Sequence, residues 1–108
     1  MTTAREKMLE LGQKLSERKA QASTIGGVFR FDIQGDGGGT FIMNLTDQIG
    51  VTEGDGAAPC TIRMSASDFV DLFEGRAAGQ QLFFSGRLTV EGDMGMALKL
   101  QALTEVLS

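Results

Sequence analysis

Few residues in this chain could carry chemistry, because it contains no histidine. Without histidine, the usual general base near neutral pH, the common zinc ligand and every Ser-His or Cys-His nucleophile pair are excluded. Catalysis would depend on carboxylates, and Asp68 and Asp71 are the nearest such pair on a predicted helix. Both also suit the start of that helix, where the helix dipole favours acidic side chains. The sequence therefore favours a protein that is not an enzyme.

Three other motifs have structural explanations. Cys60 follows a proline and alternates with Ile62 and Met64, so we expect a buried thiol that packs as a small apolar group. The glycine-rich run at 35–39 lacks the spacing of a phosphate or calcium loop and separates two alternating segments, which predicts a hairpin. The Met-Gly-Met segment at 94–96 has no histidine to complete a metal site, and methionine usually fills gaps in a core. We expect neither a cofactor nor a metal.

Length and charge restrict the class of protein. The 108 residues suffice for one domain with one core, and we treat 1–108 as a single domain. Ten basic against 14 acidic residues give a net charge of −4, and nucleic-acid binding would need clustered positive charge. No segment resembles a signal peptide or approaches the roughly 18 apolar residues of a membrane span. We expect a soluble cytoplasmic protein with at most transient membrane contact and no nucleic-acid partner.

The apolar periodicity predicts an α+β fold, with a five-stranded, mostly antiparallel sheet and helices packed on one face. A capping box at Thr3 and Glu6 marks the first helix, and Ser65 and Asp93 are expected helix N-caps. The predicted elements are a leading helix within 1–22, a four-strand meander over 26–64, short helices over 65–84, a fifth strand at 86–91 and a C-terminal helix at 93–107.

One face of this sheet should meet water. Its expected residues are polar and alternate with apolar ones along the strands: Arg30, Asp32, Asn44, Thr46, Arg63, Thr89 and Glu91. The opposite face and the helices share an unusually large apolar set, which includes seven phenylalanines and six methionines. The C-terminal helix has a wider apolar arc than contact with a sheet requires. Two interpretations remain open, a filled core and a cavity that binds an apolar ligand.

Three stretches resemble the sterol carrier protein 2 (SCP2) family: MSASDFVDLFEGR at 64–76, LFFSGRLTVEGD at 82–93 and MGMALKLQ at 94–101. The chain looks like a small, single-domain member of bacterial type. This resemblance implies an SCP2-like sheet covered by helices on one face. It also implies an apolar tunnel that takes fatty acids, fatty acyl-CoA, sterols or other lipids, without a catalytic step.

On this basis we expect non-enzymatic binding, and transfer, of an apolar lipid in a hydrophobic cavity between sheet and helices. The alternative is an interaction or accessory module with a filled core, which forms a homodimer or presents lipid substrate to a separate enzyme. The residues expected to line the cavity are all apolar: Phe31, Ile33, Met43, Ile62, Phe73, Leu82, Phe83, Leu88, Met96, Leu100 and Leu103.

Overall fold

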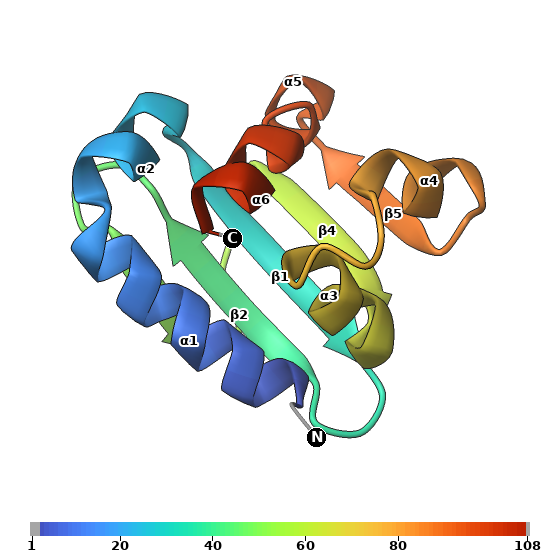
Figure 1. Cartoon of the computed structure of the whole chain (residues 1–108). Helices are drawn as coiled ribbons and strands as arrows, with labels where there is room; N and C mark the ends of the chain where they lie inside the picture. Colours follow the sequence, from blue (N-terminus) through green and yellow to red (C-terminus); the bar gives the residue numbers. More distant parts are fainter. Residues whose placement is uncertain (1–2, 108) are drawn as a thin grey trace.

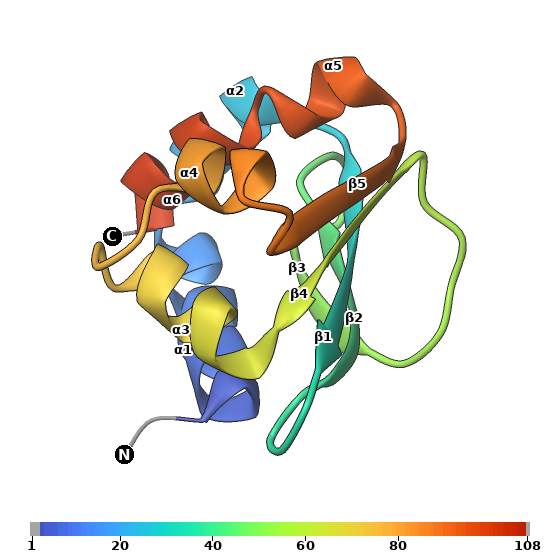
Figure 2. The same ribbon diagram turned by 90° about the vertical axis from the view of Figure 1, so that its right-hand side faces the viewer.

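The structure is a computed structural model that describes residues 3–107. Residues 1 and 2 of the predicted leading helix, and residue 108 of the predicted domain, lie outside the described residues. The helices gather on one side of a five-stranded sheet (Figures 1 and 2), which confirms the predicted fold class. The elements are, in chain order, α1 (Ala4–Glu17), α2 (Lys19–Ile25), β1 (Val28–Gln34), β2 (Gly39–Asn44), β3 (Gly50–Glu53), β4 (Cys60–Ser65), α3 (Ala66–Phe73), α4 (Gly79–Phe84), β5 (Leu88–Gly92), α5 (Met94–Ala97) and α6 (Leu100–Leu107).

The predicted helix starts are confirmed. At α1, the backbone N–H of Glu6 donates to Thr3 Oγ1 at 3.1 Å, and the Thr3 N–H donates to Glu6 Oε1 at 3.2 Å. Ser65 caps α3 by accepting the backbone N–H of Asp68 at 3.2 Å. Each of these contacts satisfies a backbone N–H that has no partner within its own helix.

The order of the strands differs from the prediction. It is β3-β2-β1-β4-β5, and β4 lies parallel to β1 while every other pair is antiparallel. The predicted meander over 26–64 is therefore correct for three strands and wrong for β4. The connection from β3 to β4 crosses the open face of the sheet (Figure 2), where Arg30 contacts it through Asp55 at 2.8 Å and the Gly56 carbonyl at 3.2 Å. Alternation shows which face a strand buries but not which strand it pairs with.

The predicted leading helix is two helices. It breaks at Arg18, whose backbone leaves the helical region at φ −123° and ψ 41°, and α2 then continues to Ile25. The Arg18 guanidinium donates to the carbonyl oxygen of Val106 at 2.5 Å, so a contact with α6 supports this corner. The sequence has no glycine or proline at the break. The contact with Val106 stabilises it instead, so no local signal marks its position.

The predicted C-terminal helix is also interrupted. After α5, the backbone N–H of Lys99 donates to the Met96 carbonyl at 3.0 Å, which is a tighter turn than an α-helix makes. The Lys99 ammonium donates to the carbonyl of Ile25 at the end of α2, also at 3.0 Å. The apolar side chains at helical spacing along this segment are nevertheless buried: Met96, Leu100, Leu103 and Leu107.

The core fills the centre of the space between sheet and helices. The ring of Phe31 on β1 lies 5.8 Å from that of Phe69 and 6.3 Å from that of Phe73, both on α3, measured between centroids. On the opposite face, Arg63 pairs with Asp32 at 3.2 Å and with Glu91 at 2.9 Å. All seven residues predicted for that face are exposed or half-buried, so its polar character is confirmed.

Candidate functional site

An apolar cavity of about 530 Å³ lies at the β5 edge of the sheet, between that strand and the helices α4, α5 and α6. This volume falls within the range of about 300–1,000 Å³ that is usual for small-molecule sites. Most of its lining is apolar: Leu72, Ala77, Ala78, Gly79, Phe83, Phe84, Leu88, Val90, Met94, Ala97, Leu98 and Leu100, with Gln80, Gln101, Thr104 and Glu105 as the polar members.

Small residues at the start of α4 create this space. Ala77, Ala78 and Gly79 follow one another along the wall, and none has a side chain longer than a methyl group. A methyl group built at Gly79 would lie 3.6 Å from Leu72 Cδ1 and 3.7 Å from Leu100 Cδ2, so this part of the wall has room for one. The helices therefore pack without closing the gap between them.

The turn after β5 sets the position of α5 at the end of the cavity. Gly92 has φ +97°, and a Cβ there would lie 2.2 Å from the carbonyl oxygen of Pro59, so only glycine fits. Asp93 then caps α5, because its Oδ1 accepts the backbone N–H of Gly95 at 2.8 Å. This turn brings α5 beside the edge strand.

The cavity has an apolar, exposed rim. Four large apolar side chains that line it are open to solvent: Phe83 at 41%, Phe84 at 75%, Met94 at 52% and Leu98 at 84%. Among residues 3–107 the one other large apolar side chain of this kind is Leu9 on α1. A cluster of exposed apolar side chains around an apolar cavity is typical of a binding surface.

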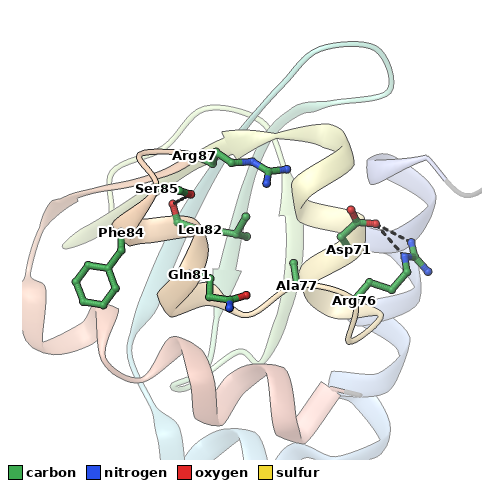
Figure 3. A pocket seen from close by; sticks show the side chains of 8 residues that line it. All are labelled: Asp71, Arg76, Ala77, Gln81, Leu82, Phe84, Ser85 and Arg87. Carbon is green, nitrogen blue, oxygen red and sulfur yellow. Dashed lines mark hydrogen bonds and ion pairs between the residues drawn. The ribbon is translucent and has the colours of Figure 1, made fainter.

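A second cavity, of about 620 Å³, lies next to the first between α3 and α4 and is polar (Figure 3). The two cavities share Ala77 and Phe84. Figure 3 shows Arg76 turned toward Asp71, to which it bonds at 2.9 and 3.0 Å; Arg76 also pairs with Glu74 at 2.5 Å. These two carboxylates, Glu74 foremost, raise the pKa of Arg76 above its ordinary value, so it stays charged.

The other arginine of the polar cavity is also paired. Arg87 Nε donates to Asp68 Oδ2 at 3.2 Å, and Arg87 Nη2 makes a second, shorter contact with Asp68 Oδ1. The Asp68 side chain is 6% exposed and the Arg87 side chain is 60% exposed, so a buried carboxylate is paired with an arginine at the surface. Asp68 and Asp71, the carboxylates that the sequence offered for catalysis, are therefore both engaged in ion pairs with arginines.

The structure separates the residues predicted to line a cavity into two sets. Phe83, Leu88 and Leu100 line the apolar cavity, and Leu82 lines the polar one. The remaining predicted residues are buried in the hydrophobic core and line neither of these two cavities: Phe31, Ile33, Met43, Ile62, Phe73, Met96 and Leu103.

Several lining residues were missed from sequence. Val90, Met94 and Leu98 line the apolar cavity and are absent from the predicted set. The run of small residues at 77–79 was the one available signal, since it leaves a helix start without bulky side chains.

The remaining chemical candidates do not form a reactive centre. Cys60 is fully buried, and burial raises the pKa of its thiol, as expected for an inert core cysteine. Within the described part of the chain, no three of its cysteine, aspartate and glutamate residues are grouped so as to hold a metal ion. Within the same residues, no helix is long and apolar enough to span a membrane.

Comparison with known proteins identifies relatives of this chain. The sequence profile of the SCP-2 sterol transfer family matches residues 6–105. Sterol carrier protein 2 of Homo sapiens is 38% identical over 100 residues, which are 87% of this chain and 18% of that protein. The chain thus spans less than a fifth of this curated relative, whose own length is mostly outside the match.

Solved structures share the fold. The sterol carrier protein domain 2 of Helicoverpa armigera has a TM-score of 0.78 and 27% identity, with 95% of this chain and 87% of that chain covered. Sterol carrier protein 2 from Aedes aegypti, solved in complex with palmitate, has a TM-score of 0.74 and 18% identity, with both chains fully covered. At the latter identity the likeness shows the fold alone.

Proposed function

Because the chain belongs to the SCP-2 sterol transfer family, we propose that it binds an apolar lipid in the cavity beside β5 and releases it chemically unchanged. The observation that carries this proposal is the combination of an apolar cavity with an exposed apolar rim. The candidate ligands are a fatty acid, a fatty acyl-CoA or a sterol-like lipid. The palmitate bound by the Aedes aegypti neighbour supports a lipid with a long hydrocarbon chain.

The volume of the cavity supports an occupied or open site over a sealed one. An enclosed void costs about 24 cal/mol per Å³, so 530 Å³ would cost about 13 kcal/mol. This is comparable to the whole stability of a domain, about 5–15 kcal/mol. The exposed rim lets water enter when no ligand is bound, and a lipid chain that replaces this water gains about 0.8 kcal/mol per methylene.

Transfer of a lipid requires the rim to meet a membrane surface. Phe84 and Leu98 are the most exposed apolar side chains of the rim, so they would contact the bilayer first. The contact is brief, because a few apolar side chains gain little by partial insertion. The protein would otherwise remain in the cytoplasm.

A vesicle assay tests this proposal. Donor vesicles carry a fluorescent lipid and a quencher, and its arrival in acceptor vesicles is followed with and without the protein. We expect the protein to accelerate transfer and Leu98→Ser to slow it several-fold. Leu9→Ser is the matched control, since Leu9 is also an exposed leucine, at 64%, but does not line the cavity. It belongs to α1, which lies across the sheet from β5 and α4 (Figure 1). A protein that neither takes up nor transfers any lipid would contradict the proposal.

The exposed rim also favours a second candidate function, that of an interaction or accessory module. In this case Phe84 and Leu98 would be covered by a second copy of the chain, or by an enzyme that receives the lipid. Sedimentation at several protein concentrations separates the two functions. Stable dimers that take up no lipid would support the module, and lipid-loaded monomers would support the carrier.

A further inference from the structure

The polar groups around the apolar cavity carry no positive charge. Among the described residues that line it, none is lysine or arginine, and the polar members are Gln80, Gln101, Thr104 and Glu105. A lipid carboxylate or phosphate placed in this cavity would find no lysine or arginine among the described lining residues. Burial of a charge without a partner is far more costly than burial of a neutral polar group that is hydrogen-bonded.

The uncharged groups of this wall suit a neutral hydrogen-bonding partner. The side-chain amides of Gln80 and Gln101 make no hydrogen bond within residues 3–107, so they can bind a ligand. The Thr104 hydroxyl donates to the Gln101 carbonyl at 2.7 Å and keeps its own oxygen as an acceptor. An amide both donates and accepts, and therefore matches a hydroxyl, a ketone or an ester.

The adjacent polar cavity does not supply the missing charge. Its two guanidinium groups, of Arg76 and Arg87, face three carboxylates, those of Asp68, Asp71 and Glu74. An anionic head group that drew Arg87 away would leave the buried Asp68 without a partner. Glu74 also pairs with Lys7 at 3.6 Å, and Lys7 pairs with Glu10 at 2.6 Å, so these ion pairs together hold three cations and four carboxylates. Their net charge is −1, which disfavours an anionic head group here as well.

We infer that the apolar cavity selects lipids whose polar end is uncharged, such as an alcohol, a ketone or an ester, over lipids that end in a carboxylate or a phosphate. This inference rests on the lipid-binding function proposed above and narrows it. It also separates this chain from the Aedes aegypti neighbour, whose palmitate is a carboxylate.

A competition between matched lipids tests the inference. The protein is equilibrated at about pH 8, where an isolated carboxyl group is ionised, with phosphatidylcholine vesicles that contain equal amounts of oleyl alcohol and oleate. It is then separated from the vesicles, and its bound lipids are quantified by mass spectrometry. We expect oleyl alcohol to be enriched over oleate by about tenfold or more relative to the vesicles, which corresponds to about 1.4 kcal/mol.

Two variants connect the preference to the cavity. Gln101→Arg adds a cation to the wall and should raise the share of oleate at least about fivefold, or about 1 kcal/mol. Gln13→Arg makes the same change of net charge on an exposed part of α1, away from the cavity, and should leave the ratio unchanged.

The outcomes are distinct. Uptake of oleate equal to or above that of oleyl alcohol overturns the inference while the lipid-binding function stands. Uptake of neither lipid overturns both. A preference for the alcohol that Gln101→Arg leaves untouched overturns the assignment of selectivity to this cavity.

Discussion

Ala97→Phe should weaken lipid binding without unfolding the protein. Ala97 is half-buried on α5 and lines the apolar cavity, so a larger side chain at this position extends into the space that the ligand needs. The substitution adds about six carbon atoms. If about half of their volume replaces ligand, roughly three methylenes lose their site, and at about 0.8 kcal/mol each the loss is about 2.4 kcal/mol. This corresponds to a decrease in affinity of about fifty-fold.

The assay is a titration with a fluorescent lipid, because the chain has no tryptophan to report binding. Ala102→Phe is the matched control, since Ala102 is exposed on α6 and does not line the cavity. Both substitutions lower helix propensity by a similar amount, so the melting temperatures of the two variants should be close. That of Ala97→Phe should be the higher if its ring fills part of the cavity. Equal lipid affinity of Ala97→Phe and the wild-type protein would refute a ligand site at α5.

Two further predictions concern stability. Arg87→Ala should lower the free energy of unfolding by about 1–3 kcal/mol, measured by chemical denaturation, because it leaves the buried carboxylate of Asp68 unpaired. Asp68→Ala should cost less, because it leaves an exposed guanidinium that water can solvate. The reverse order would contradict this reading of the pair. Hydrogen bonds with Thr3 lower the pKa of Glu6 below its ordinary value of 4.5. The ionised Glu6 side chain therefore stabilises the folded protein above pH 4.5, and this stabilisation is lost as the pH falls through the lowered pKa. Glu6→Gln keeps the cap but does not titrate, so its melting temperature should fall less than that of the wild-type protein between about pH 5 and pH 3; parallel curves would count against this role of Glu6.

Local features of the fold could be predicted from sequence because they depend on neighbouring residues. The capping box at Thr3 and Glu6, the cap at Ser65 and the alternation of the strands all act within a few positions of the chain. The place of β4 beside β1 could not be predicted, since alternation defines the buried face and not the partner strand. The break at Arg18 was missed for a related reason, because a carbonyl 88 residues away stabilises it.

The candidate site was harder to predict than the fold. Sequence patterns indicate which side chains are apolar, and the predicted set was chosen on that basis. Phe31 and Phe73 are indeed buried, but they pack against each other and fill the centre of the core. The cavity arises instead where side chains are short, at 77–79, and where exposed leucine and methionine side chains surround an opening. Apolar periodicity does not indicate where a cavity of this kind lies between the elements.

The position of a bound lipid tests the proposed ligand site beside β5 most directly. In protein with labelled alanine, leucine and methionine methyl groups, saturated with oleyl alcohol, intermolecular nuclear Overhauser effects report which methyl groups contact the hydrocarbon chain of the lipid. We expect contacts to Ala97, Leu98 and Leu100, which line the cavity beside β5. Contacts confined to Met43 and Leu45, which are fully buried in the hydrophobic core, or no contacts at saturation, would contradict the proposed site.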